Sequence, residues 1–192
     1  MILSHPEFVA RLVKPGADIL SSLTAPTTDL WHAVTGIAGE AGEIFEVIRG
    51  RADMLPGAWE EQLIEELGDM EFYMQQTRAN LSLQRSPYCD TVTELSLQST
   101  WAARLVIASL KLLDRAKKVA VYNKAADVEA MALLMFDIDV AMAALRQSIA
   151  ATREEVLEHN IGKLSKRYPG IAYSDQAAQA RADKVGTVDD AA

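Results

Sequence analysis

The sequence predicts an all-α fold, a helical bundle of about five main helices built on two antiparallel helical hairpins. Aromatic residues make up only 6% of the 192-residue chain, and no stretch shows the sustained alternation of apolar and polar residues that is typical of strands. Apolar residues recur instead at every third or fourth position, which is the spacing of one helix face. We expect a single domain over residues 1–185, followed by a flexible tail over 186–192.

Helix start and stop signals divide the N-terminal half of the chain. A short helix is expected around residues 5–13, and two long helices over 28–50 and 58–84 form the first hairpin, with a turn at 54–57 between them. The residues that give these boundaries are Pro15-Gly16 after the short helix, Thr27 or Thr28 as N-cap, Gly50 near the end of the second helix and Ser86-Pro87 after the third.

The C-terminal half is expected to add a second hairpin and two further helices. Helices over 92–122 and 126–151 form this hairpin, with Asn123 as the C-cap of the first. The signals for the last two helices are a capping box at Thr152-Arg-Glu-Glu155, a stop at Tyr168-Pro169-Gly170 and an N-cap at Ser174, after which the final helix reaches about residue 184.

Charge and composition argue against several classes of protein. With 19 Lys and Arg residues against 27 Asp and Glu, the net charge is −8, which argues against binding DNA or RNA through phosphate contacts. The single cysteine, Cys89, cannot form an internal disulfide, so a reducing cytoplasm is the expected compartment. The first residues lack the features of a signal peptide, and no uncharged apolar run reaches the roughly 18 residues of a membrane span. We therefore expect a cytoplasmic protein without a membrane partner.

Two pairs of acidic residues lie in the first hairpin: Glu40 with Glu43, and Glu66 with Asp69. Residues three apart share one helix face, with Cβ atoms about 5–6 Å apart. Each pair flanks an apolar stripe at the same offsets, so antiparallel packing through the stripes leaves both pairs on one side. Because the pairs also lie symmetrically about the turn at 54–57, we expect the four carboxylates to converge. The stripes are Ile37, Ala41, Ile44 and Ile48 on the first helix, and Leu63, Leu67, Met70 and Met74 on the second.

The four acidic side chains predict a site for a divalent cation, because converging carboxylates repel one another unless a cation or protons neutralise them. Carboxylate oxygens suit hard ions, so Mg²⁺ is the expected cofactor and Mn²⁺ is an alternative. Gly39, Gly42 and Gly68 beside the acids each cost about 1 kcal/mol in a helix interior relative to Ala. Such small residues permit the close approach of either a ligand or a neighbouring helix.

A ridge of hydrogen-bond donors follows on the helix opened by the capping box. Asn160, Lys163 and Arg167 lie together on one flank of that helix. An amide, an ammonium and a guanidinium match a polyphosphate, although a solvated basic last turn would give the same pattern. The expected apolar stripe of this helix consists of Leu157, Ile161, Leu164 and Tyr168.

Three segments resemble the MazG-like all-α nucleoside triphosphate pyrophosphohydrolases, and the short phage and bacterial members are the nearest match. The segments are Gly36-Ile-Ala-Gly-Glu-Ala-Gly-Glu43, Glu65-Glu-Leu-Gly-Asp-Met-Glu-Phe-Tyr73 and Asn160-Ile-Gly-Lys-Leu-Ser-Lys-Arg-Tyr168. The resemblance implies hydrolysis of a nucleoside triphosphate to the monophosphate and pyrophosphate. It also implies Mg²⁺ bound by Glu40, Glu43, Glu66 and Asp69. Gly39 stands where many members carry a further acidic residue, so the number of metal ions stays open.

The sequence offers more than one candidate for the proton acceptor and for contact with the base. Glu43 or Glu46 is the candidate acceptor for the proton of the attacking water. The candidates for contact with the base are Trp31, His32 and Tyr73, although aromatic residues at helix seams are more often part of the core.

Two other functions are compatible with the pattern. The first is a di-iron carboxylate bundle, because Asp29 and His32 have the spacing of a metal pair, although no second acid-x-x-His follows. The second is a non-enzymatic helical adaptor with solvated acids. We expect a homodimer or a dimer of dimers, since long helices with apolar stripes are often buried between subunits. The identity of the nucleotide is left open.

Overall fold

The computed structural model describes residues 4–55, 57–90, 92–93 and 96–183, and over these residues the chain forms helices and no strand. The prediction of an all-α fold is confirmed. No helix among the described residues combines the length and the apolar character needed to cross a membrane. The expected tail over 186–192 lies outside the described residues.

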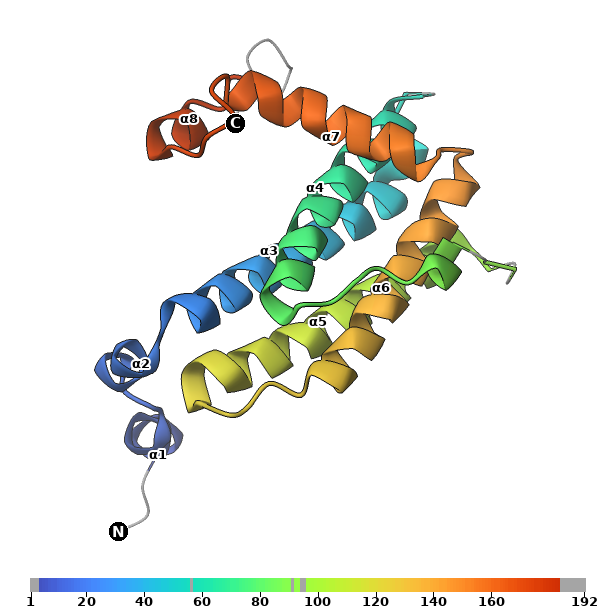
Figure 1. Cartoon of the computed structure of the whole chain (residues 1–192). Helices are drawn as coiled ribbons and strands as arrows, with labels where there is room; N and C mark the ends of the chain where they lie inside the picture. Colours follow the sequence, from blue (N-terminus) through green and yellow to red (C-terminus); the bar gives the residue numbers. More distant parts are fainter. Residues whose placement is uncertain (1–3, 56, 91, 94–95, 184–192) are drawn as a thin grey trace.

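The N-terminal arm contains two short helices, α1 (His5–Leu12) and α2 (Gly16–Ser22), neither of which has a buried residue. Helix α2 contacts α5 (Gln98–Tyr122), and α1 projects from the bundle (Figure 1). Helix α2 was not predicted. Pro15 ends α1 as expected, but it is also the N-cap of α2, because its fixed φ is compatible with a helix start.

The first long pair consists of α3 (Ala25–Gly50) and α4 (Ala58–Leu81), joined through the short helix η1 (Arg51–Asp53). The N-cap of α3 is Thr24, in a capping box with Thr27, so the prediction of Thr27 or Thr28 is wrong. Pro26 in the first turn explains the earlier start, since the missing amide proton is not needed there. Helix α4 ends at Leu81 rather than near 84, because Ser82 takes a left-handed conformation with φ of 55°.

The second long pair consists of α5 (Gln98–Tyr122) and α6 (Val128–Ser148), preceded by the short helix η2 (Pro87–Asp90). Helix α5 begins at Gln98, well after the expected residue 92. Asn123 is confirmed as its C-cap, with φ of 51°. The side chain of Asp127 caps α6 by accepting a hydrogen bond from the amide of Ala130.

The last two helices are α7 (Arg153–Arg167) and α8 (Asp175–Ala180). The capping box at Thr152 is confirmed, and so is Ser174 as the N-cap of α8. Helix α8 is shorter than predicted, because Arg181 adopts a left-handed conformation with φ of 43°.

Helix α3 lies along both α4 and α5, and α5 also packs on α6 (Figure 1). In the same view α3 and α4 run in opposite directions, and α7 crosses over α4. All eight residues of the two predicted stripes are buried, with exposed fractions of 4% or less. The seam between α3 and α4 is therefore apolar, as predicted, and it fixes the rotation of both helices about their axes.

Candidate metal centre

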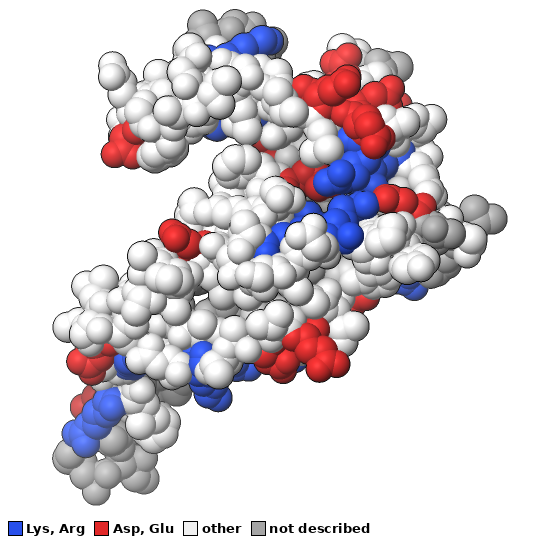
Figure 2. Space-filling view, in the orientation of Figure 1, with Lys and Arg blue, Asp and Glu red and all other residues white. Residues whose placement is uncertain are grey.

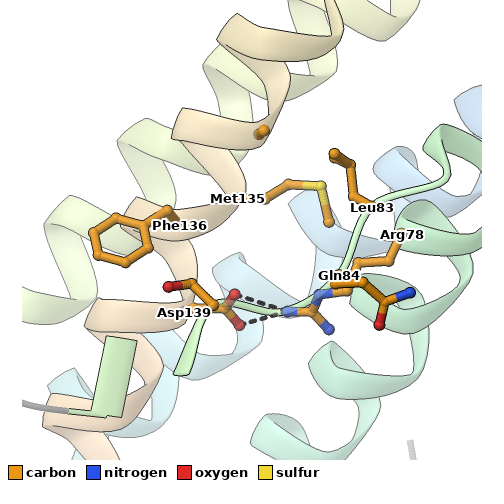
Figure 3. A pocket seen from close by; sticks show the side chains of 8 residues that line it. Arg78, Leu83, Gln84, Met135, Phe136 and Asp139 are labelled. Carbon is orange, nitrogen blue, oxygen red and sulfur yellow. Dashed lines mark hydrogen bonds and ion pairs between the residues drawn. The ribbon is translucent and has the colours of Figure 1, made fainter. Parts of the chain in front are cut away.

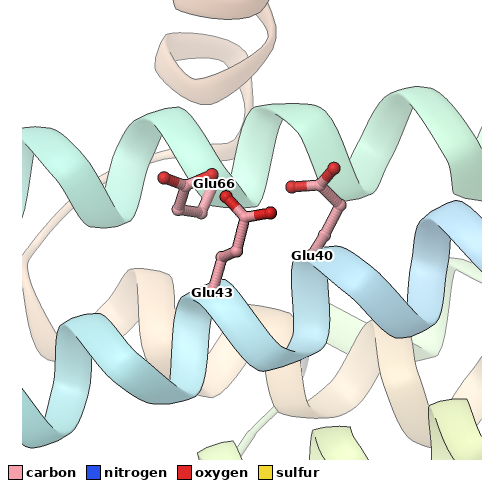
Figure 4. Close-up of side chains that lie close together, drawn as sticks. All are labelled: Glu40, Glu43 and Glu66. Atoms are coloured by element: carbon pink, nitrogen blue, oxygen red, sulfur yellow. The ribbon is translucent and has the colours of Figure 1, made fainter. Parts of the chain in front are cut away.

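Three glutamates converge across the seam between α3 and α4. Glu40 and Glu43 extend from α3 and Glu66 from α4, and one carboxylate oxygen of each lies within 4.8 Å of the others (Figure 4). The buried stripes place them side by side, because the two acid pairs flank the stripes at equal offsets and lie at equal distances from the turn. This part of the expected convergence is present in the structure.

The three carboxylates occupy a poorly solvated and mutually repulsive environment. Burial raises the pKa of Glu40 to about 8, with further contributions from the charges of Asp69, Glu43 and Glu66. Burial likewise raises the pKa of Glu66 to about 7, and Glu43, Glu65 and Asp69 add to the effect. Glu66 is only 6% exposed. A hard divalent cation fits this donor set, because it offers oxygen ligands alone and neutralises the repulsion that otherwise favours protonation.

The fourth predicted acid, Asp69, lies beside this group and is bound by α7. Nδ2 of Asn160 donates a hydrogen bond of 2.7 Å to Oδ1 of Asp69, and the ammonium of Lys163 donates to Oδ2. The same ammonium lies 3.1 Å from the carboxylate of Glu65. The structure thus brings three of the four acids together and places the fourth in an ion pair next to them.

The orientation of α7 differs from the prediction. Val156 and Asn160 are buried against α4, whereas Ile161, expected in the apolar stripe, is 64% exposed. A Cβ added at Gly68 would lie 2.9 Å from the Cβ of Asn160 and 3.3 Å from the carbonyl oxygen of Val156. Gly68 therefore allows α7 to approach closely at this point, and this contact decides which face of α7 is inside.

Two of the three predicted donors reach the acidic group. Asn160 and Lys163 are bound to Asp69, as described above, whereas the guanidinium of Arg167 makes two hydrogen bonds to Asp183, of 2.6 and 2.5 Å. Asp183 raises the pKa of Arg167 through this pairing. This pair was not predicted, because Asp183 was expected to lie in the final short helix.

The predicted aromatic residues lie one or two turns along the seam from the acids. The rings of His32 and Tyr73 meet edge to face, with centroids 6.1 Å apart. The Tyr73 ring also packs on the backbone of Gly36, where an added Cβ would lie 2.5 Å from ring atoms. Tyr73 packs against the core, Trp31 is half-buried and His32 is exposed. Of the three, His32 is the most accessible to a ligand.

A pocket of about 200 Å³ opens beside the glutamates, toward the turn between α3 and α4. Glu43, Glu46 and Glu66 contribute to its wall, so both of the residues predicted as proton acceptor, Glu43 and Glu46, line this pocket. Among the glycines of α3, Gly39 and Gly42 face open space, since an added Cβ would meet no atom within 4 Å. The glycines beside the acids thus separate into two kinds: Gly68 accommodates a helix, and the other two are packed against no neighbouring element.

Glu65 lies beside the site but was not among the predicted site residues. Glu65 shares the Lys163 ammonium with Asp69, and the only signal in the sequence was its place at the start of a quoted motif. The alternative di-iron site was based on Asp29 and His32. Neither residue belongs to a group of three or more clustered ligand side chains among the described residues.

The chain matches no protein-family model, no curated protein sequence and no solved structure. We therefore infer a function from the arrangement of these side chains and from the resemblance of the three motifs.

Proposed function

We propose that this protein is a Mg²⁺-dependent pyrophosphohydrolase that cleaves a nucleoside triphosphate to the monophosphate and pyrophosphate. The observation that carries the proposal is the convergence of Glu40, Glu43 and Glu66 within 4.8 Å, next to the Asp69–Lys163 ion pair. Carboxylates and phosphate-binding donors in one place are what the MazG-like resemblance implies. A phosphate substrate needs both, because the acids alone would repel it.

The three glutamates hold the cation in this proposal, with Asp69 adjacent to them. Mg²⁺ would supply positive charge to the phosphate oxygens and lower the pKa of water at the site, and Mn²⁺ is the alternative ion. Asn160 and Lys163 present an amide and an ammonium beside the carboxylates, where they can orient the phosphate chain. Arg167 joins them only if its pair with Asp183 opens.

Hydrolysis adds water across a phosphoanhydride bond, and the proton that is released needs an acceptor. Glu43 and Glu46 both line the pocket beside the site and are the two candidates. His32, and with it Trp31 and Tyr73, are the candidates for contact with the base. As part of the same proposal the protein acts in the cytoplasm as a homodimer or a dimer of dimers. Exposed apolar side chains on α1 support the oligomer, because such side chains are often covered by another subunit. Phe8 is 52% exposed and Leu12 is 67% exposed.

The test is a panel of canonical, deoxy and modified nucleoside triphosphates incubated with the protein and Mg²⁺. We expect pyrophosphate, and not orthophosphate, from at least one of them, and no reaction in EDTA. Release of orthophosphate alone, or of nothing, would refute the assignment. Iron and a visible absorption band in the purified protein would instead favour the di-iron bundle.

Two variants separate phosphate binding from cation chemistry. Lys163→Ala removes a donor, so it should mainly raise KM, whereas Glu66→Gln, at one of the three glutamates that hold the cation, should abolish turnover with helix content intact. Equal and modest effects of both on kcat/KM would mean that the α7 donors are structural and that the proposed division of roles is wrong.

A further inference from the structure

A second group of charged side chains, which we call the arginine cluster, is separate from the group formed by Glu40, Glu43 and Glu66. Arginines and acids from α4, from η2 and the segment before it, from α6 and from the start of α7 meet there, and several of them are buried. The cluster consists of Arg78, Arg85, Arg146 and Arg153 with Glu71, Asp90 and Asp139. It has four positive and three negative groups.

Each of the three carboxylates already has its own guanidinium, bound through two hydrogen bonds. Arg78 binds Asp139 at 2.6 and 2.8 Å (Figure 3). Arg85 binds Asp90 at 2.6 and 2.7 Å, and Arg153 binds Glu71 at 2.7 and 2.8 Å. Two-point pairs of this kind satisfy the carboxylate oxygens well. Three of the four arginines are therefore neutralised.

Arg146 is the arginine left over. It is 3% exposed, and it shares Asp90 with Arg85 through one hydrogen bond of 2.8 Å. Its Nη1 lies 3.8 Å from the nearest oxygen of Glu71 and has no hydrogen-bond acceptor among the described residues, as is also the case for Nη1 of Arg78 and Nε of Arg85. Arg146 therefore shares both of its counter-charges with other arginines, and a buried guanidinium that is incompletely paired is costly, because burial penalises the charged form. Burial accordingly lowers the pKa of Arg146.

A pocket of about 350 Å³ opens at this arginine. Arg85, Arg146 and Arg153 line it, together with Asp90, Gln147 and the exposed Glu154. The first turn of α7 forms part of its wall, and the N-terminus of a helix carries positive partial charge. Figure 2 shows basic side chains gathered between α4, α6 and α7, with acidic side chains on either side.

We propose that this pocket binds the phosphate group of a small metabolite. A phosphate offers negative charge and hydrogen-bond acceptors to a pocket lined by three arginines, and its oxygens match guanidinium groups presented from several sides together with a helix N-terminus. The volume is at the lower end for small-molecule pockets, which limits the ligand to a compact molecule. The inference does not depend on the glutamates or on the proposed hydrolysis.

The test uses inorganic phosphate as the probe, with calorimetric titration in EDTA at pH 7.5 and constant ionic strength. We expect saturable binding of phosphate that acetate does not reproduce. The informative variant is Glu154→Gln, which removes an exposed negative charge from the pocket wall and should lower the Kd about threefold. Glu129→Gln, an exposed change of the same charge at the far end of α6, is the matched control and should leave the Kd unchanged.

Arg146→Gln should weaken phosphate binding by about tenfold or more, since it removes a charge-assisted donor. Lys163→Ala should not weaken it, which distinguishes this pocket from the glutamate site. If Arg146→Gln fails to fold, the comparison of Glu154→Gln with Glu129→Gln still decides. The proposal is overturned if phosphate does not bind, if acetate binds equally, if the two glutamate variants behave alike, or if Lys163→Ala abolishes the binding.

Discussion

Gly68 on α4 and Asn160 on α7 lie in such close contact that a Cβ added to the glycine would be 2.9 Å from the Cβ of the asparagine. The same asparagine donates to Asp69 from its amide, and one turn further along α7 Lys163 donates to the other oxygen. A single close crossing of two helices therefore sets the position of the donors beside the glutamate site.

The first prediction concerns this crossing. Gly68→Ala should lower the free energy of unfolding, because the contacted atoms belong to a Cβ and a backbone carbonyl and cannot move without displacing α7. Gly42→Ala is the control. Its Cβ meets nothing within 4 Å, so it should stabilise the metal-free protein by up to about 1 kcal/mol through helix propensity. Denaturant unfolding of both variants measures the difference, and a stabilising Gly68→Ala would show that the helices do not cross so closely.

A second prediction follows from the repulsion among the glutamates. Glu66→Gln should leave the stability of the metal-free protein at pH 8 unchanged or raise it. The substitution removes a carboxylate that is repelled by its neighbours in the folded state but not in the unfolded chain. Most point mutations instead cost about 1 kcal/mol. The thermal midpoint of wild type and variant in EDTA, at matched ionic strength, is the measurement.

Added Mg²⁺ should stabilise the wild type more than it stabilises Glu66→Gln. At ten times its Kd the ion should stabilise the wild type by about 1.4 kcal/mol through linkage, and it should do much less for Glu66→Gln. Matched ionic strength is needed here too, because salt screens the net charge of −8. A Mg²⁺ effect of equal size in both proteins would mean that Glu66 is not a ligand.

The third prediction is a pH dependence of stability. The pKa values of Glu40 and Glu66 rise from 4.5 to about 8 and about 7, so in this range the folded protein holds protons that the unfolded chain has released. Their contribution to stability is full below pH 4.5 and is lost as the pH rises to 8. We expect the metal-free wild type to lose about 1 kcal/mol or more across the window relative to the double variant Glu40→Gln/Glu66→Gln. Parallel stability curves for the two proteins would contradict the prediction.

The fourth prediction concerns the buried pair of Arg78 and Asp139, in which both side chains are 4% exposed. Arg78→Met should cost about 3 kcal/mol, because it leaves a buried carboxylate with only the more distant Arg85 as its partner. The double variant Arg78→Met/Asp139→Leu should recover much of that loss. The exposed pair of Asp114 and Lys118 on α5 is the comparison, and its double-mutant cycle should give a far smaller coupling. Similar couplings for both pairs would mean that burial does not control the strength of the Arg78 pair.

Local signals predicted much of the secondary structure. Asn123, Thr152 and Ser174 were identified as caps because each supplies its own conformation or hydrogen bond from within a few residues. The same approach failed where two local signals competed. Pro15 both ends one helix and begins the next, and Ser82 ends α4 before the proline at 87 that was expected to end it.

The seam between α3 and α4 was determined by sequence alone, because its periodicity fixes which residues are inside and hence where Glu40, Glu43 and Glu66 meet. The face of α7 was not, because its buried residues are chosen by a contact with Gly68, 92 positions from Asn160. The arginine cluster was also invisible in the sequence. Its pairs join residues up to 82 positions apart, and an isolated Arg or Asp is ordinary on a helix surface. Only packing removes these charges from water, and only then does the pairing of each one matter.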